Sequence, residues 1–397
     1  MGRFVSRILF VHDLLDFKAG GAVRVILNLL SAMDAQRFDL HLGTPRSKEP
    51  TPAEFGELGA ELHELPPLEQ TSDRSLRGIL KTLGELLRLN LAMLALLRRC
   101  RPDFVYVHSV TSMHFAVLPA WLLRVPLVYH EHGLASLRSR SLWDYALPTL
   151  IRRSAHVICI ASTIRDETIA TGVPPERVTT VPNGIEEVPV PPRLPGEAAL
   201  GGAGGEPFSV VQIANLLRWK GHATLIRAAA EARQEVPELR ICFYGRSLSA
   251  EFDEELRLLS RELGVGDIVE FGGYRPGIAE LLGGFDCLVV ASDSEPFGLV
   301  LLEGMRAGVP VIGTRAGGVP EIVTDGHDGL LFEPGDSSQL AQHFVRLARD
   351  RHLARRLAEN GLVTLAERFS VPAQARGVEA VFEGLAASRP PGPTRSP

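Results

Sequence analysis

The segment Ser292–Glu303, with the sequence SDSEPFGLVLLE, holds the densest group of residues that could bind a ligand. It follows the apolar run DCLVV, which predicts a strand, so it begins at a strand's carboxyl end. Pro296 favours the first turn of a helix, and Glu295 and Glu303 could each accept hydroxyl groups, one from a hexose and one from a ribose. The alternative is a helix whose acidic N-terminus only balances its dipole. A helix that begins here would leave three backbone amides free for a phosphate, those of Phe297, Gly298 and Leu299.

A second candidate group lies in the sequence NLLRWKG, Asn215–Gly221, directly after the strand-like run SVVQI. Lys220 in such a strand-to-helix loop can neutralise a diphosphate. The alternative is a solvated loop cation. Only four of the 42 cationic residues are lysines, so a lysine at this place favours a function.

Two glycine turns could also lie against a ligand. GGVPE, Gly317–Glu321, follows the strand-like run VPVIGT, and its glycines allow close approach of a backbone or ligand, while the Pro-Glu pair can open a helix. The alternative is a tight turn. In the first half, Gly20 and Gly21 lie between the first strand and its helix, where a phosphate or sugar could rest. The chain lacks both GxGxxG and GxxxxGK[ST] at this place, which counts against dinucleotide reductases and P-loop NTPases.

Three histidines fall at or just past predicted strand ends, namely His108, His130 and His132. Together with Glu131 they suggest a metal, but HEHG is not HExxH and the sequence shows no second ligand cluster nearby, so we predict no metal. If the strand ends at His130, the two rings of HEHG need not share a direction, and one of them can be a packing residue. No GxSxG elbow is present, which counts against a Ser-His-Asp triad.

Short runs rich in valine and isoleucine alternate with helical patterns, which is typical of βαβ units and parallel sheets. Residues 188–207 are almost all proline, glycine and small residues and are interpreted as a linker. The sequence therefore predicts an α/β protein with two Rossmann-like, doubly wound domains facing each other across a cleft. Strands are expected at 7–12, 104–108, 126–130 and 156–161, and then at 208–213, 239–245, 268–272, 286–290 and 309–313.

Composition narrows the class of protein. The 397 residues are 45% apolar and 22% charged, which excludes disordered and fibrous chains. A net charge of −5 argues against a nucleic-acid partner. Four widely separated cysteines without CxxC spacing argue against disulfides and zinc and favour a reducing compartment. We expect a cytoplasmic protein, because neither a signal peptide nor a membrane-spanning run is recognisable.

The stretch Arg74–Arg101 combines a stripe of leucines with seven cations and one acid. Such a pattern suggests peripheral contact with an anionic membrane surface. The alternative is that the stripe packs on the first domain's own sheet while the cations are solvated.

Taken in order, AGG, EHG, PNG, the KG loop, EPFGLVLLE and GGVPE resemble the retaining glycosyltransferases of family 4, which have the GT-B fold. The resemblance covers nearly the whole chain and is strongest in the second half. It implies transfer of a sugar from a nucleotide-diphosphate donor, with retention and without an obligatory metal. The acceptor stays open between a glycan, a lipid-linked glycan and a small molecule. Residues 1–187 would then be the acceptor-side domain and 208–370 the nucleotide-sugar-binding domain, with a helix at 371–387 returning to the first domain and a disordered tail at 388–397.

The same resemblance implies roles for single residues. Lys220 would contact the diphosphate, Glu295 the donor hexose and Glu303 the ribose. His132 would lie beside the transferring carbon, and Gly20–Gly21 near the diphosphate and acceptor. The amides of Phe297–Leu299 would lie at the diphosphate or sugar.

One position departs from the family pattern. The family usually has an arginine five residues before the loop lysine, and this chain has Asn215 there. Either Arg218 or Arg246 supplies part of that charge, or donor binding is weakened. Two other functions remain open at this point, a non-catalytic GT-B subunit and a GT-B sugar-nucleotide epimerase.

Overall fold

The computed structural model describes residues 6–13, 21–46, 58–68, 75–133, 147–186 and 207–388. The chain divides into two compact units, which we call the N-terminal unit (Met1–Gly184 with Val371–Pro397) and the C-terminal unit (Ile185–Ser370). Gly20, nearly all of the predicted linker and the tail from 389 lie outside the described residues.

The N-terminal unit is built on a seven-stranded sheet in which every described pairing is parallel. The predicted strands are present because their Val- and Ile-rich runs are buried on both faces by helices. From edge to edge the strands are β3 (Glu61–Leu65), β2 (Phe38–Pro45), β1 (Ser6–Val11), β4 (Phe104–Val107), β5 (Leu127–Glu131), β6 (His156–Cys159) and β7 (Val178–Thr180).

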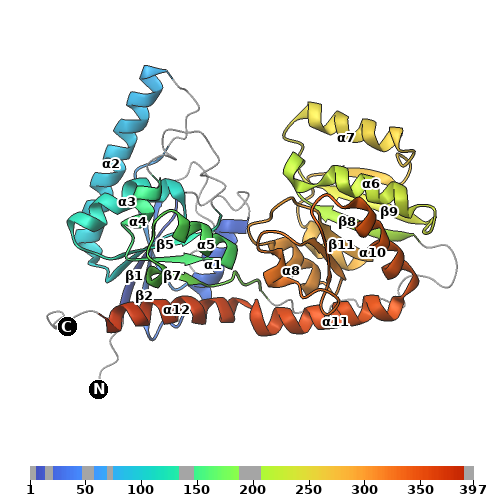
Figure 1. The fold of residues 1–397 in the computed structure, drawn as a ribbon. Helices are drawn as coiled ribbons and strands as arrows, with labels where there is room; N and C mark the ends of the chain where they lie inside the picture. The colour runs from blue at the N-terminus through green and yellow to red at the C-terminus, as the bar shows by residue number, and fades with distance from the viewer. Residues whose placement is uncertain are drawn as a thin grey trace. The chain divides into compact units, whose positions relative to one another are not determined.

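Helices cover this sheet (Figure 1). The C-terminal helix α12 belongs to the same unit, where the Asp34 amide after α1 donates to the Glu379 carboxylate of α12 at 2.7 Å. The helices are α1 (Gly21–Ala32), α2 (Leu76–Cys100), α3 (Val110–Leu122), α4 (Leu147–Arg152), α5 (Ser162–Ala170) and α12 (Val371–Ala387), with a short 3-10 turn at Pro175–Arg177.

The C-terminal unit holds a six-stranded sheet, again with parallel pairings throughout its described part. Its strands in spatial order are β10 (Val269–Gly273), β9 (Leu239–Tyr244), β8 (Phe208–Ile213), β11 (Cys287–Val290), β12 (Val311–Thr314) and β13 (Leu330–Phe332). Its helices are α6 (His222–Ala232), α7 (Ala250–Glu262), α8 (Leu299–Arg306), α9 (Val319–Ile322), α10 (Ser337–Arg349) and α11 (Arg351–Arg368), with 3-10 turns at Arg218–Lys220 and Ile278–Gly284. Both sheets place their first strand inside, which is the doubly wound order, so the predicted pair of Rossmann-like domains is confirmed.

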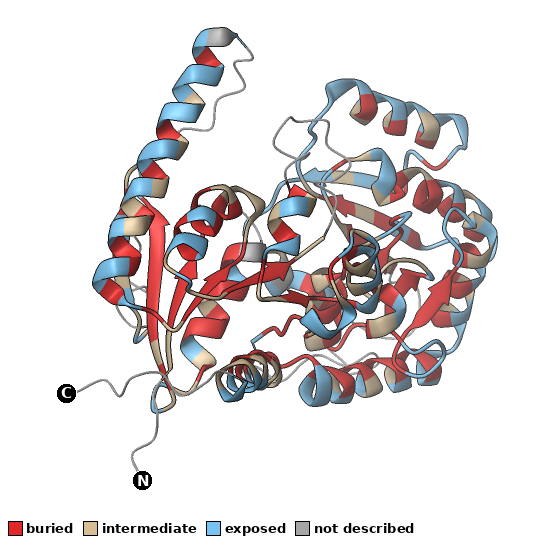
Figure 2. Ribbon diagram, turned by 60° about the vertical axis from the view of Figure 1, so that its left-hand side comes forward, coloured by how far each residue is buried: buried red, intermediate tan, exposed pale blue. Residues whose placement is uncertain are grey.

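The long helix α2 divides its apolar residues between two faces. Ser75 caps its first turn, with the hydroxyl accepting from the Gly78 amide at 3.2 Å. One face is buried, through Leu89, Met93, Leu96 and Leu97, whereas another row is exposed, through Leu80, Leu83, Leu87 and Leu91 (Figure 2). The exposed row shows that only part of the predicted stripe packs on its own domain. Among the described residues, no helix is both long enough and apolar enough to cross a bilayer.

Candidate active site

Three loops of the C-terminal unit leave the sheet at neighbouring strand ends. They follow β8, β11 and β12, which are adjacent in the sheet order. Because all these strands run the same way, their carboxyl ends meet at one edge, which is where ligands bind in open α/β sheets. Lys220, Glu295 and Gly317 therefore come together at that edge.

Lys220 and Glu295 form the centre of this group. The Nζ atom of Lys220 lies 2.6 Å from Oε2 of Glu295, and the Ser292 hydroxyl donates to the same oxygen at 2.9 Å. The lysine ammonium also lies 4.0 Å from the ring centre of Trp219. Both side chains of the pair are about one-sixth exposed, at 17% and 16%, so a ligand can reach them. The structure thus joins two residues that lie 75 positions apart in the sequence.

The lysine loop is fixed closely against the end of β11. Gly221 has a φ of +71°, and a Cβ atom there would lie 1.8 Å from the carbonyl oxygen of Ala291. The Asp293 amide donates to the Trp219 carbonyl at 2.8 Å, and the Gln212 side-chain amide donates to the Lys220 carbonyl at 2.8 Å. Lys220 is therefore held in place by backbone contacts on both sides.

We expect Gly221→Ala to displace the lysine loop from the end of β11, because the methyl group would overlap the Ala291 carbonyl oxygen. Gly264 is the matched control: its φ is +68°, but no atom lies within 4 Å of the added Cβ. Gly264→Ala should lower the free energy of unfolding by only about 1–2 kcal/mol, from its left-handed backbone. Gly221→Ala should cost more and also abolish binding of a nucleoside diphosphate, as denaturant unfolding and calorimetry would show. Equal losses for both variants would contradict the close fit of the loop.

The helix after Glu295 begins later than the sequence predicted. Pro296 does not lie in its first turn, since α8 starts at Leu299 with Gly298 as its N-cap at a φ of +111°. The reason is that Glu295 pairs with Gly317 in a parallel bridge, with the Gly318 amide donating to the Glu295 carbonyl at 2.8 Å. This pairing keeps the segment extended. Of the three predicted amides, only that of Leu299 belongs to the first turn of the helix.

The other candidates of this segment make different contacts. Phe297 is a core residue, 3% exposed, whose ring packs 6.0 Å from that of Phe369. Glu303 lies just over one turn into α8 and is half-buried. Gly317 and Gly318 are close to the backbone of Glu295, so the GGVPE turn supports the glutamate loop.

Asn215 and the two candidate arginines differ in what they contact. The Asn215 carboxamide oxygen accepts from the Arg246 amide at 3.0 Å, which places Arg246 beside the lysine loop. The Arg246 guanidinium lies 4.4 Å from the ring centre of Tyr274. Arg218 instead pairs with Glu255 of α7 at 2.7 Å. Arg218 is thus already neutralised by a carboxylate.

In the N-terminal unit, four histidines gather at the carboxyl ends of β1, β4 and β5. The ring centres of His130 and His132 are 4.3 Å apart, and those of His108 and His132 are 5.9 Å apart. His12 lies near enough to act on His132 electrostatically. His130 is fully buried, and its Nδ1 is 2.7 Å from the Tyr106 hydroxyl. His130 therefore has a fixed packing partner, whereas His132 is less buried.

The rings of His108, His130 and His132 are neutral near pH 7. Burial lowers the pKa of His132 to about 4 and the pKa values of His108 and His130 well below 6.5, the usual histidine value. Burial also raises the pKa of Glu131 to about 7. Ring nitrogens of His108, His130 and His132 lie within 4.8 Å of one another, a donor set that suits a transition metal. One of the nitrogens of His130, Nδ1, already lies 2.7 Å from the Tyr106 hydroxyl.

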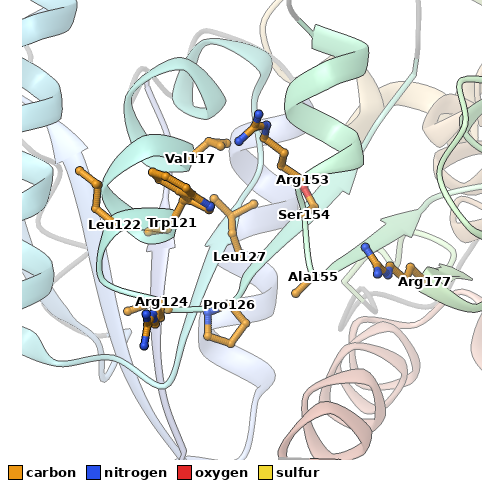
Figure 3. A pocket seen from close by; sticks show the side chains of 12 residues that line it. Val117, Trp121, Leu122, Arg124, Pro126, Leu127, Arg153, Ser154, Ala155 and Arg177 are labelled. Atoms are coloured by element: carbon orange, nitrogen blue, oxygen red, sulfur yellow. The ribbon is translucent and has the colours of Figure 1, made fainter.

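Gly21 is the first residue of α1, directly after the undescribed Gly20. A separate pocket in this unit lies at the opposite, N-terminal ends of the strands (Figure 3). Pro126, Ala155 and Arg177, which directly precede β5, β6 and β7, contribute to its lining. It is therefore not part of the edge that carries the histidines.

Two family models match the chain, one in each half. The family described as Glycosyltransferase Family 4 matches residues 19–187, and Glycosyl transferases group 1 matches residues 201–363. N-acetyl-alpha-D-glucosaminyl L-malate synthase of Bacillus anthracis is 36% identical over 160 residues, which is 40% of this chain and 41% of that protein. D-inositol 3-phosphate glycosyltransferase of Acidothermus cellulolyticus is 31% identical over 310 residues, 72% of this chain and 68% of that protein. The matched part of this chain thus spans under half of the first relative and about two thirds of the second.

The fold is shared with solved structures. HepE of Anabaena in complex with UDP-glucose aligns with a TM-score of 0.75 and 23% identity over 95% of this chain and 99% of that one. Sucrose-phosphate synthase of Thermosynechococcus elongatus aligns with a TM-score of 0.75 and 22% identity over 97% and 100%. Two Rossmann-like units of this kind define the GT-B fold. The chain belongs to the glycosyl transferases group 1, glycosyltransferase family 4, a class of retaining enzymes that take their sugar from a nucleotide-sugar donor.

Three contacts of the site were missed by sequence reasoning: those of Ser292, Gln212 and Trp219. Ser292 lies two residues past the end of β11, and its carbonyl accepts from the buried Thr314 hydroxyl at 2.7 Å. A polar residue at a strand's carboxyl end is a signal that could have found Ser292. No such signal marks Trp219.

Proposed function

We propose that this protein transfers a hexose from a nucleotide-diphosphate sugar to a glycan, a lipid-linked glycan or a small molecule, with retention and without an obligatory metal. The observation that carries the proposal is the contact of Lys220 with Glu295 at the carboxyl edge of β8 and β11. A cation and a carboxylate side by side suit a ligand that presents a diphosphate next to a polyhydroxylated ring. The family of the chain supports this reading.

Each group of the donor has a chemical match in this site. The ammonium of Lys220 neutralises the diphosphate, whose negative charge grows as the nucleotide departs. A fixed donor aimed at such charge contributes about 3–4 kcal/mol. Glu295 accepts hydroxyl groups of the hexose, Glu303 accepts those of the ribose, and the Leu299 amide adds the partial positive charge of a helix N-terminus. Ser292, which already donates to Glu295, keeps that carboxylate oriented.

His132 acts at the transferring carbon. Its pKa of about 4 keeps the ring neutral, so it hydrogen-bonds the donor or acceptor without placing a second cation in the site. His130 supports it by packing. Gly20 and Gly21 let the donor approach the start of α1, as the family resemblance implies.

Arg246, and not Arg218, supplies the charge that Asn215 lacks. Arg246→Ala should weaken nucleoside diphosphate binding by about 1.5–3 kcal/mol, the cost of a lost charge-assisted contact. Arg218→Ala should leave that binding nearly unchanged, because Arg218 already pairs with Glu255. Calorimetry on the two variants compares two exposed arginines of the same unit. If Arg218→Ala weakened nucleoside diphosphate binding more than Arg246→Ala does, Arg218 would supply the charge.

A panel of nucleotide sugars tests the proposal as a whole. HepE is described in complex with UDP-glucose, so UDP-sugars are the first donors to try. The true donor should raise the melting temperature by mass action. It should then be turned over only when an acceptor is present, with the product anomer retained. Turnover without any acceptor to an isomeric nucleotide sugar would indicate an epimerase. Binding without turnover would indicate a non-catalytic subunit.

We also propose that the protein works in the cytoplasm at the inner face of a membrane, where α2 makes peripheral contact. The exposed leucines 80, 83, 87 and 91 are 48–62% exposed and recur every three or four residues, so they share one helix face. Cations of the same stretch, among them Arg77, Arg88 and Arg98, suit an anionic lipid surface.

Replacing these four leucines with serine should release the protein from vesicles that contain anionic lipid. Each inserted leucine contributes on the order of 1 kcal/mol, so the four together account for most of the binding. Leu258→Ser on α7, 47% exposed, is a control that should not change co-sedimentation. If the wild type sediments equally with neutral and anionic vesicles, or with neither, the membrane contact is wrong.

A further inference from the structure

A second cluster of metal-ligating side chains lies in the N-terminal unit, away from the histidines at the carboxyl strand ends. It consists of His41, His63 and Cys100, which are 4%, 7% and 5% exposed. Nδ1 of His41 lies 2.9 Å from Nε2 of His63, and Sγ of Cys100 lies 3.4 Å from that same nitrogen. The ligand atoms of the three residues lie within 4.8 Å of one another, and imidazoles and thiols are the ligand types that zinc prefers.

The fold brings these residues together from three elements. In the register of β2 and β3, His41 is opposite Glu61 and Gly43 is opposite His63. Because side chains alternate between faces along a strand, His41, Glu61 and His63 project from the same face of the sheet. Cys100 is the last residue of α2, which ends over that face. The ligands are thus supplied by an edge strand, its neighbour and a helix end.

Glu61 supplies a fourth candidate ligand, as a tetrahedral site requires. Its two carboxylate oxygens lie 3.5 Å from His41 Nδ1 and 3.7 Å from His63 Nε2. With metal bonds of about 2.0–2.3 Å, a tetrahedral zinc ion separates its ligand atoms by roughly 3.3–3.6 Å. The measured separations of 2.9–3.7 Å bracket that range. The Glu61 side chain is 68% exposed, which gives an ion a way in from solvent.

We propose that His41, His63, Cys100 and Glu61 bind one Zn²⁺ ion, which ties β3 to β2 and to the end of α2. Binding releases one proton to solvent, that of the Cys100 thiol, while each imidazole binds as a neutral ring that keeps its single proton on the nitrogen facing away from the metal. The site has no part in sugar transfer, since it lies on other strands than His132. The absence of CxxC spacing hid it from the sequence, because its ligands come from three separate elements.

The side chains around His41 already suit a zinc ligand. Those around His63 suit one once the Arg99 side chain has moved. Oδ1 of Asp39 lies 3.3 Å from His41 Nε2, the carboxylate–histidine pairing that orients a zinc ligand, and Arg7 holds Asp39 at 2.6 Å. Arg99 lies 3.4 Å from His63 Nδ1, which carries a proton once Nε2 binds the metal. Arg99 is exposed, so its guanidinium can turn toward solvent.

Titration of the full-length, reduced, metal-free protein with Co²⁺ tests this site, because a cobalt–thiolate bond has its own charge-transfer absorption. The wild type should bind one Co²⁺ with that band and with the visible bands of a tetrahedral ion, and Zn²⁺ should displace it and raise the melting temperature. Cys100→Ser should lose the charge-transfer band. Asp39→Asn should keep the band but weaken Co²⁺ binding roughly 10–100-fold.

Two controls separate this cluster from other metal ligands. Cys242→Ser removes a partly buried cysteine of the C-terminal unit and should leave the band unchanged. Cobalt bound by His108, His130 and His132 would show no sulfur band, because that cluster has no cysteine. The proposal is overturned if the wild type shows no cobalt–thiolate band, or if the band persists in Cys100→Ser.

Discussion

Replacing His132 with alanine should abolish sugar transfer while nucleoside diphosphate binding stays nearly intact. We propose that the ring acts at the transferring carbon and that Lys220 holds the diphosphate. Loss of a positioned polar group at a reacting centre typically lowers kcat by about 100-fold or more. Because burial holds the pKa of His132 near 4, protonation of this ring should limit the rate only close to that pH and not near 6.5. Initial rates over a pH series, with calorimetry for binding, measure both effects.

His130→Ala is the matched control for this prediction. His130 is 0% exposed and bonded to the Tyr106 hydroxyl, so its removal leaves a cavity and an unpaired hydroxyl in the core. We expect a lower melting temperature with activity per folded molecule retained. If His130→Ala abolished transfer and His132→Ala only lowered the melting temperature, His130 would be the functional histidine.

The second large effect is expected at Lys220. Lys220→Ala removes the cation that we propose for the diphosphate, so nucleoside diphosphate binding and transfer should fall together, by about 1.5–3 kcal/mol or roughly 10- to 150-fold. The variant also leaves the Glu295 carboxylate without its 2.6 Å partner, and this carboxylate then repels the diphosphate. The loss should therefore lie toward the upper end of that range.

The two glutamates should separate binding from turnover. Glu303→Gln should mainly weaken nucleotide binding, since a ribose hydroxyl loses an ionised acceptor. Glu295→Gln should spare the bare nucleoside diphosphate, which carries no hexose, yet strongly depress turnover of the full donor. Calorimetry with the diphosphate alone and initial rates with the full donor distinguish them. If Glu295→Gln weakens the bare diphosphate as much as Lys220→Ala does, Glu295 does not bind the hexose.

The buried strands could be predicted from the sequence where valine and other apolar residues fill both faces, as in β4 (FVYV) and β11 (CLVV). Strands with polar or short sequences were missed. In β2 and β3 the runs FDLHLGTP and ELHEL carry histidine and acid, because these side chains meet one another in the cluster at His41. The strands β7 and β13 have only three residues each, too few to show an alternation.

Lys220 and Glu295 could each be found from their place after a strand, but not their contact. That contact depends on β8 being next to β11, a matter of strand order that local sequence does not encode. The start of α8 was misplaced for a similar reason. Pro296 favours a helical turn locally, but the bridge to Gly317 comes from a different loop and holds the chain extended.

A crystal structure with an intact nucleotide-sugar donor, in a variant inactive at His132, tests the central claim most directly. We predict that Lys220 Nζ contacts a diphosphate oxygen and that the Glu295 carboxylate accepts a hexose hydroxyl, with the ribose near Glu303. The account would be contradicted if Lys220 still contacted only Glu295 and the nucleotide bound elsewhere, for example in the arginine-lined pocket beside Trp121 (Figure 3).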